Sequence, residues 1–449
     1  MKTKVIIKNT VVVKNSPDAV VSLLKTKLTY SNPQYVQAVK NGRYIPNSMP
    51  RTVQFYKERD SKLMVPKGYM HHVLYLLGSK TKVVDRTVAP DIDISFKGTL
   101  RPYQNKATKD ILNRRFGVLK AATGSGKTVM GTFIASRRKT TTLVVVHNKE
   151  LLYQWVNAFK QFTDTKEIGI IGDGKYKIKP ITIGIVNSVT KKVDELNKEF
   201  GLVIYDECHR VVSPIWMNII NNMYCKYQLG LSATPYRSDK LTDVIFQLIG
   251  PTLHEVNKKD LQRTKAVLEP KIVRCSTQFE YRFNQDYAKM ISKLTEDDAR
   301  NERVINRIIN DYNTYKEPIM VVSDRVSHCE ILHKLLRLNS RIKTVVLSSK
   351  VPKKERKQVV EQLKNRKYDV LISTTSLLGE GFDAPILNAL FLTTPIKFSG
   401  RLIQIVGRIL RPSKGKQPRV YDFRDPLTPV LRFSGFSRDK VYKANGWNQ

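Results

Sequence analysis

The residues best suited to chemistry lie in a short segment, residues 121–128, which reads AATGSGKT. Small residues let backbone N–H groups wrap a chain of phosphates, Lys127 can reach the β- and γ-phosphates, and the Thr128 hydroxyl can ligate magnesium. The strict form of such a loop has glycine where Ala121 stands, but its other required positions are in place. A chance glycine turn before a helix is the alternative. The apolar run before the loop and the helical stretch after it favour a nucleoside triphosphate site.

A pair of carboxylates, Asp206 and Glu207, follows another apolar run, residues 202–205. A carboxylate at the end of a parallel strand beside a phosphate loop can hold Mg²⁺, and its neighbour can polarise the attacking water. We assign Thr128 and Asp206 to the metal and Glu207 to the water. An acidic pair after a strand would by itself suit a solvated loop, so the phosphate loop upstream is what favours ATP hydrolysis.

Apolar runs in two series predict the strands that position these residues. They are residues 117–120, 142–147, 182–186 and 202–205, and then residues 319–323, 344–347, 369–373 and 389–392. Continuous Val, Ile and Leu suit parallel strands that are covered on both faces. We therefore predict an α/β fold with two tandem parallel-sheet domains. Their join is expected between residues 251 and 270, where the sheet pattern lapses.

Taken together and in order, these motifs resemble superfamily 2 helicases, with residues 206–209 as a DECH version of the box usually written DEAD or DEAH. The resemblance covers about residues 97–425. It implies two RecA-like domains of a P-loop NTPase motor that uses ATP and Mg²⁺. Nucleotide contacts are carried over to Arg101, Gln104, Ala122, Thr123, Gly124, Ser125, Gly126, Lys127, Thr128, Gly381 and Asp383. In this set Gln104 would read the adenine, with help from Arg101.

The resemblance also implies which residues touch nucleic acid. These are His147, Asn148, Lys149 and Gln154 in the first lobe and Thr374 and Thr375 in the second. Residues 232–234, Ser-Ala-Thr, resemble the motif that links ATP hydrolysis to strand movement, although a Ser/Thr-rich turn after a strand is the alternative.

Two arginines of the second lobe complete the expected catalytic set of Lys127, Asp206, Glu207, Arg408 and Arg411. Residues 404–411 resemble the last helicase motif, in which two arginines act as fingers. Charge on the transferring phosphoryl group must be neutralised by donors, which is the role that the resemblance gives them. Solvated helix arginines would explain either one alone. Ile405 replaces an arginine that is frequent in the family.

The composition points to a polyanionic partner. The 449 residues include 78 Lys plus Arg against 39 Asp plus Glu, a formal net charge of +39. Such an excess is typical of proteins that bind DNA, RNA or an anionic membrane. No apolar run approaches the ~20 residues needed to span a bilayer, and no signal peptide is recognisable, so we expect a cytoplasmic protein without a membrane partner. The four cysteines show no metal-ligand spacing and are expected to be reduced.

The first 95 residues predict a small α/β accessory domain, with strands over 5–8 and 10–14 and a helix over 17–28. Aromatic and basic residues alternate between Tyr30 and Lys57. They could stack bases and hold phosphates, or the tyrosines could build the core of the domain. The predicted layout is residues 1–95 for this DNA-binding accessory domain, 96–258 and 259–430 for the RecA-like domains, and 431–449 for a C-terminal tail.

Residues 101–104, Arg-Pro-Tyr-Gln, are similar to DNA-directed members of the superfamily. Those members include XPB-type helicases, restriction-enzyme motors and phage UvsW-type branch-migration helicases. We therefore expect a monomeric, phage-type helicase that unwinds or branch-migrates forked or junction DNA in replication, recombination or repair. An RNA helicase, a restriction-type translocase that does not separate strands, and a non-motor ATP switch remain the alternatives.

Overall fold

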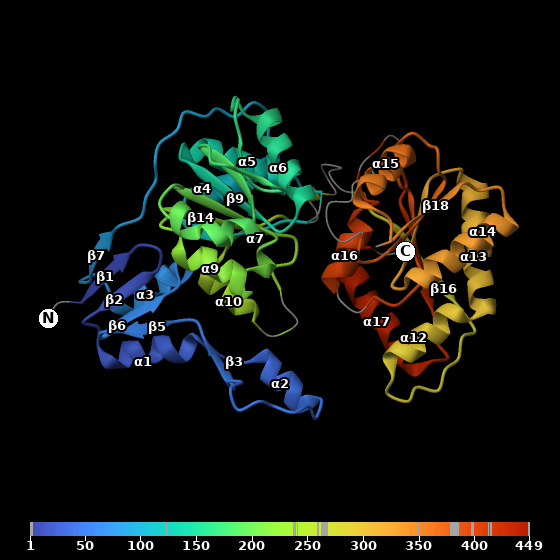
Figure 1. Cartoon of the computed structure of the whole chain (residues 1–449), viewed down its shortest axis with the longest axis horizontal. Helices are drawn as coiled ribbons and strands as arrows, with labels where there is room; N and C mark the ends of the chain where they lie inside the picture. Colours follow the sequence, from blue (N-terminus) through green and yellow to red (C-terminus); the bar gives the residue numbers. More distant parts are fainter. Residues whose placement is uncertain are drawn as a thin grey trace. The chain divides into compact units, whose positions relative to one another are not determined.

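The computed structural model of the chain describes residues 3–122, 124–236, 239, 241–257, 260–261, 268–348, 350–377, 386–396, 399–411, 413 and 415–447. The chain divides into two compact units (Figure 1). Unit 1 comprises residues 1–122 and 126–257, and unit 2 comprises residues 258–449 together with 123–125.

The N-terminal part of unit 1 is a five-stranded sheet with helices against one face. Its elements are β1 (Lys4–Ile7), β2 (Val11–Lys14), α1 (Asp18–Lys27), β3 (Thr29–Ser31), α2 (Pro33–Lys40), β4 (Thr52–Gln54), β5 (Lys57–Arg59), β6 (Lys62–Val65), η1 (Lys67–Tyr69), α3 (Met70–Leu77) and β7 (Lys82–Asp85). The strand order is β5-β6-β2-β1-β7, and β3 pairs separately with β4. Only β1 and β7 run parallel among these pairs. Alternate residues such as Val5 and Val13 enter the core, where Leu24 of α1 joins them.

The rest of unit 1 is an eight-stranded sheet in the order β11-β10-β12-β9-β13-β14-β8-β15. The strands are β8 (Phe116–Lys120), β9 (Thr142–Val146), β10 (Gly169–Gly172), β11 (Lys175–Lys177), β12 (Ile181–Ile185), β13 (Leu202–Asp206), β14 (Tyr227–Ser232) and β15 (Thr252–Glu255). All neighbours are parallel except β10 and β11, which form a hairpin. Parallel strands end at the same edge of the sheet, so the segments after β8, β13 and β14 are brought together there.

Helices flank this sheet. They are α4 (Pro102–Leu112), α5 (Lys127–Arg138), α6 (Lys149–Phe162), α7 (Val186–Val189), η2 (Thr190–Lys192), α8 (Val193–Leu196), η3 (Cys208–Arg210), α9 (Pro214–Asn222) and α10 (Thr242–Ile249). The boundary between the units falls after Asn257. The sheet pattern does not lapse at residue 251, however, because β15 pairs with β8 as an edge strand.

Unit 2 contains a six-stranded, all-parallel sheet in the order β16-β21-β20-β17-β19-β18. Its elements are β16 (Lys271–Ser276), α12 (Tyr287–Glu296), α13 (Asp298–Tyr315), β17 (Ile319–Ser323), α14 (Val326–Asn339), β18 (Thr344–Leu347), α15 (Lys353–Lys364), β19 (Val370–Thr374), β20 (Ala389–Leu392), α16 (Ser399–Gly407), β21 (Arg419–Arg424) and α17 (Pro429–Ala444). Residues 431–449, expected as a tail, include most of α17. Its Leu431 and Tyr442 are buried in the unit, so this helix is part of the fold.

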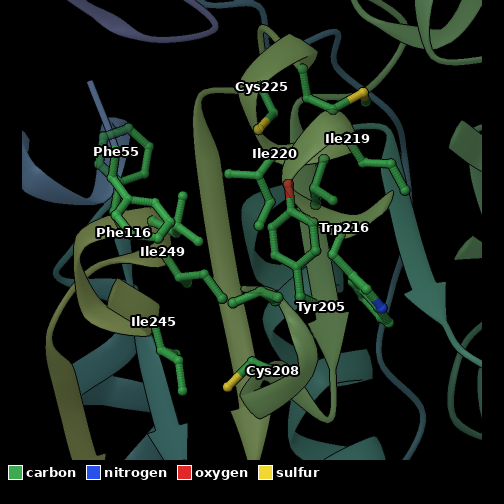
Figure 2. Close-up of a cluster of buried hydrophobic side chains, with 14 of the residues drawn as sticks. Phe55, Phe116, Tyr205, Cys208, Trp216, Ile219, Ile220, Cys225, Ile245 and Ile249 are labelled. Atoms are coloured by element: carbon green, nitrogen blue, oxygen red, sulfur yellow. The ribbon is translucent and has the colours of Figure 1, made fainter. Parts of the chain in front are cut away.

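The N-terminal sheet and the first lobe share one hydrophobic core. Phe55 of the N-terminal part lies close to Phe116 and Ile249 of the lobe (Figure 2). Lys67 is buried at this junction, and its Nζ donates to Met223 O at 2.8 Å and to Cys225 O at 3.1 Å. The N-terminal part is therefore packed into unit 1 rather than tethered to it.

The aromatic residues of the N-terminal part divide between the two roles considered above. Tyr30 packs edge-on against Phe55, and its hydroxyl accepts a hydrogen bond from Gln247 Nε2 at 2.6 Å. Tyr44, in contrast, is 87% exposed. Core building thus accounts for Tyr30 and Phe55 but not for Tyr44.

Candidate nucleotide site

The phosphate loop leaves β8 and enters α5 through two glycines in the left-handed region. Gly124 has a φ of 84° and Gly126 a φ of 80°, conformations that L side chains rarely adopt. Gly126 is also the N-cap of α5, so the backbone N–H groups of the first helical turn point into the loop. N–H groups and a helix dipole in this arrangement can cradle phosphate oxygens.

Gln104 lies against this loop. It is buried in the first turn of α4, and its Oε1 accepts a hydrogen bond from the backbone N of Arg101 at 2.9 Å. A Cβ on Gly126 would come within 2.4 Å of Gln104 Nε2, so only glycine allows this approach. The predicted adenine-reading residue and the predicted phosphate loop are therefore neighbours, although α4 precedes the loop by a whole strand.

Lys127 is partly buried at the start of α5, and its Nζ donates to Ala121 O at 3.0 Å. The side chain thus folds back along the loop, with its ammonium group where β- and γ-phosphates would be cradled. Thr128 follows at the next helical position and is also partly buried.

Asp206 is buried at the end of β13, and both carboxylate oxygens are engaged. Oδ2 accepts from Trp155 Nε1 of α6 at 2.8 Å, and Oδ1 accepts from the backbone N of Glu207 at 3.0 Å. Burial and the neighbouring Glu207 raise the pKa of Asp206. Burial opposes ionisation of Glu207 as well, but the hydrogen bond from His209 and the Lys127 ammonium hold the pKa of Glu207 below its ordinary value. Of the pair, Glu207 is the stronger anion.

His209 connects the acidic pair to β14. Its Nδ1 lies 3.3 Å from Glu207 Oε2 and 3.3 Å from Ser232 Oγ. Ser232 Oγ in turn accepts from the backbone N of Thr234 at 3.1 Å. Because β14 lies between β13 and β8, Ser232 is near both the acidic pair and the phosphate loop. Ala121 N also donates to Ser232 O at 3.0 Å.

The residues present fit ATP with Mg²⁺. The loop supplies the N–H cradle and a lysine, and the Thr128 hydroxyl and the Asp206 carboxylate are hard oxygen ligands of the kind that Mg²⁺ prefers. Among the described residues, no group of three or more His, Cys, Asp or Glu could hold a metal ion. Mg²⁺ needs no such cage, because it is usually bound by one or two carboxylates together with substrate phosphates. Thr128 and Asp206 are the side chains that would hold it.

The predicted nucleic-acid residues of the first lobe begin α6. Asn148 caps this helix, since its Oδ1 accepts from Leu151 N at 2.8 Å. Burial and the nearby Arg210 guanidinium lower the pKa of His147 to about 4, so its ring is neutral at physiological pH. Lys149 forms an ion pair with Asp173 of the β10–β11 hairpin, and Gln154 is exposed. Lys149 and Gln154 are thus the two accessible polar groups of the set.

The predicted residues of the second lobe are more buried. Thr374 is the last residue of β19 and Thr375 follows it; they are 4% and 3% exposed. The Thr375 hydroxyl donates to Asp324. Arg408 and Arg411 follow α16 and are partly buried. Ile405, which replaces a frequent arginine, is fully buried in the core of the lobe. Thr123, Gly381 and Asp383 lie outside the described residues.

Several contacts at the site have no signal in the sequence. Trp155 is 51 residues from Asp206, yet it donates to the carboxylate. Asp173 binds both Lys149 and the Tyr153 hydroxyl, the latter at 2.8 Å. A tryptophan on the apolar face of a helix, such as Trp155, is typical of a buried core residue. The dipeptide Asp173-Gly174 is typical of a hairpin turn. Neither pattern therefore indicates a functional site.

Comparison with known proteins agrees with this geometry. The family of the res subunit of type III restriction enzymes matches residues 97–237, and the helicase conserved C-terminal domain matches residues 300–413. A protein of Acanthamoeba polyphaga mimivirus named as an ATP-dependent RNA helicase is 29% identical over 80% of this chain and 70% of its own length. The DNA 3'-5' translocase XPB2 of Sulfurisphaera tokodaii is 26% identical over 77% and 86%.

The fold is also similar to a solved structure, the Hef helicase domain of Pyrococcus furiosus. It matches 76% of this chain and 98% of that one, with 15% identity and a TM-score of 0.52. The predicted fold class, two tandem RecA-like domains with parallel sheets, is confirmed, as is the resemblance to superfamily 2 helicases of the XPB type. No described helix is both long and apolar enough to cross a bilayer.

Proposed function

Because this chain is an ATP-dependent helicase of superfamily 2, we propose that it acts on forked or junction DNA, which it unwinds or branch-migrates in replication, recombination or repair. The observation that carries the motor assignment is a set of contacts that meets at Ser232 from two sides. Asp206, Glu207 and His209 reach Ser232 in succession. Lys127 donates to Ala121 O, and Ala121 N donates to Ser232 O. A binding protein that used ATP only as a structural ligand would not need an acidic pair joined to a second motif.

We assign the chemistry of ATP hydrolysis to this set. The loop N–H groups and Lys127 bind the phosphates. Thr128 and Asp206 would hold Mg²⁺, which would supply positive charge to neutralise the charge that develops there. Glu207, the stronger anion of the pair, orients and polarises the attacking water. The hydrogen bond from Trp155 Nε1 fixes the Asp206 carboxylate, and with it the position where Mg²⁺ would be held. Arg408 and Arg411 are proposed to donate to the transferring phosphoryl group.

DNA is favoured over RNA by the relatives and by the segment before the loop. XPB2 is named as a DNA translocase, and residues 101–104 are similar to DNA-directed members. The mimivirus relative is named as an RNA helicase, so an RNA substrate is the second candidate. The N-terminal part, packed on the first lobe, is proposed as a DNA-binding accessory domain.

The experiment measures ATP hydrolysis with single-stranded DNA, a fork, a four-way junction and RNA. We expect the strongest stimulation by the branched DNAs. Glu207→Gln keeps the size of the side chain and its hydrogen bonding but removes the charge. It should lower kcat of the DNA-stimulated ATP hydrolysis at least about 100-fold. As a control, Glu150→Gln removes a carboxylate at an exposed position of α6 and should have no effect. Stimulation by RNA alone would overturn the DNA assignment.

A further inference from the structure

The outer face of the N-terminal sheet carries a row of cations that the helicase motor does not use. Strand pairing places Arg59 opposite Lys62, Lys62 opposite Lys14, Lys14 opposite Lys4, and Lys4 opposite Lys82. The row therefore has one cation on each of the five strands. The strand order is β5-β6-β2-β1-β7 (Figure 1). We call these five residues, Arg59, Lys62, Lys14, Lys4 and Lys82, the cation row.

Alternation along the strands separates the charges by sign. The residues that share a face with Val5 and Val13 point into the core, and those that share a face with Lys4 and Lys14 point outward. The two acidic residues of these strands, Glu58 and Asp85, fall on the inner side. Glu58 pairs there with Lys25 of α1, and Asp85 pairs with Arg115. The charged side chains that these strands present to the outer face are thus all cations.

A shallow cavity of about 350 Å³ lies on this face. It is lined by Ile6, Lys8, Val12, Lys14, Arg59, Asp60, Lys62, Met64 and Arg86. Ile6, Val12 and Met64 are paired across adjacent strands and form an apolar floor beside the cation row. Lys8 and Arg86 extend the cationic rim beyond that floor. The acidic side chain in the lining is Asp60, 3.7 Å from both Arg59 and Lys62.

Such a row is costly without a partner. Like charges directly opposite on neighbouring strands are destabilising, and here the arrangement repeats four times in succession. One carboxylate at 3.7 Å does not balance five cations. A polyanion laid along the row would relieve this repulsion and release its own counterions.

We propose that the cation row is a second DNA-binding surface, separate from the motor motifs, that takes the phosphate backbone of a duplex arm. Four strand spacings of about 4.8 Å make the row about 19 Å long. That length matches about five or six phosphates of one strand along a duplex axis, at about 3.4 Å each. The described residues of the face include no aromatic ring, so it cannot hold a single strand by stacking bases.

This inference rests on the proposed DNA substrate, and it assigns separate tasks to the two parts of the chain. The motor would act on the strand that it translocates, while the outer face holds a duplex arm by charge alone. A helicase that works at forks or junctions needs such a hold, because the arms of a branched substrate lead away from the motor.

The test replaces the centre of the row. Lys14→Glu/Lys62→Glu should weaken binding of the full chain to a blunt DNA duplex about tenfold, and should lower the slope of log Kd against log salt by about two, one for each phosphate contact. The matched control is Lys27→Glu/Lys334→Glu, which makes the same charge change at exposed positions on α1 and α14. The control should keep the wild-type slope.

Stability separates loss of binding from loss of folding. Since the row is self-repelling, the Lys14→Glu/Lys62→Glu variant should unfold at or above the wild-type temperature. If it unfolds earlier, Lys14→Gln/Lys62→Gln repeats the measurement with half the charge change. Equal loss of binding in row and control variants, or an unchanged salt slope, would overturn the proposal. Binding is measured without ATP, so failure of the motor assignment would show separately, as an ATPase that no DNA stimulates.

Discussion

His209 illustrates how one side chain can join two motifs. Its Nδ1 lies 3.3 Å from both Glu207 Oε2 and Ser232 Oγ. A shift of the Glu207 carboxylate would therefore move Ser232 of β14 through this ring. If the contact couples ATP hydrolysis to β14, the effects of substituting His209 and Ser232 must be non-additive. A double-mutant cycle tests this.

We expect His209→Ala and Ser232→Ala each to lower DNA-stimulated ATP hydrolysis, and the double variant to lose little more than either single one. The coupling energy should be about 0.5–3 kcal/mol, as for contacting residues in one hydrogen-bond network. The measurement is kcat/KM for ATP in the four proteins, with fork DNA at saturation. Additive losses would show that the two motifs act independently.

His328 in unit 2 gives stability a pH dependence of known sign. Its ring is fully buried, Nδ1 lies 2.9 Å from Ser323 Oγ, and Nε2 lies 2.9 Å from Asn301 Oδ1. Burial, with Arg300 nearby, lowers the pKa of His328 to about 3. The unfolded chain binds a proton at this residue below its ordinary pKa, about 6.5, while the folded chain does not. Stability contributed by the neutral ring is therefore present above that pH and is lost as the pH falls.

As the pH falls below about 6.5, the neutral His328 should lower the free energy of unfolding by about 1.4 kcal/mol per pH unit. His328→Gln retains hydrogen-bonding groups but does not titrate. The difference between wild type and His328→Gln, measured by urea unfolding, should be constant from pH 8 to 7 and should shrink steadily towards pH 5. A difference that stays constant over the whole range would contradict the assigned neutral ring.

At the scale of elements, α5 and α6 are held together by a close approach at one glycine. A Cβ on Gly131 of α5 would meet Trp155 Cη2 at 2.6 Å, so the indole that holds Asp206 rests on this position. Gly435 of α17 is also inside a helix, but its added Cβ would meet its nearest atom, Arg424 Cδ, at 3.7 Å, an ordinary contact. The two glycines form a matched pair.

Gly131→Ala should destabilise the protein by about 1–3 kcal/mol through overpacking, and should also impair ATP hydrolysis because Trp155 must move. Gly435→Ala should instead stabilise it by about 0.5–1 kcal/mol, the usual gain for alanine within a helix. Thermal unfolding of the two variants checks both signs. Equal effects would mean that the approach of Trp155 to Gly131 is not tight.

Elements with uniform apolar character were predictable, and mixed ones were not. Residues 319–323, 344–347 and 389–392 were expected as strands and are strands with the same bounds. β14 was missed because Gln228 and Gly230 interrupt its apolar run. β16 and β21 were missed because charged residues interrupt both of them. The phosphate loop and the acidic pair could be found from local spacing. Strand register could not, and it is register that forms the cation row and brings Ser232 between the two motifs.

At the scale of the whole molecule, the N-terminal part is fixed to the first lobe at a backbone contact. A Cβ on Gly68 would come within 2.4 Å of Gly250 N and 2.6 Å of Ile249 C, at the end of α10. Backbone atoms cannot swing aside as a side chain can. Gly68 therefore determines whether η1, with the buried Lys67 beside it, can pack on the lobe.

Gly68→Ala should separate the two parts without unfolding the motor. We expect faster proteolysis in the connecting residues 86–100 and a loss of at least about 1–3 kcal/mol from overpacking. Gly42→Ala is the control: its φ of 59° costs about 1–2 kcal/mol locally, but its added Cβ would have no atom within 4 Å. Limited proteolysis followed by mass spectrometry checks both. Equal protection of residues 86–100 in the two variants would contradict a tight junction.

The net charge of the chain predicts how it holds nucleic acid. With a formal net charge of +39, affinity should come mainly from phosphate contacts and the release of counterions. If about 6–10 phosphates are contacted, affinity for fork DNA should fall about 10³–10⁵-fold between 50 and 200 mM salt, as it does for proteins that make that number of contacts. Fluorescence anisotropy over a salt series measures this slope. ATP hydrolysis without DNA over the same series is the control, because the buried Asp206 and the phosphate loop should be screened much less. A flat binding response would show that base contacts or stacking, rather than the basic surface, hold the substrate.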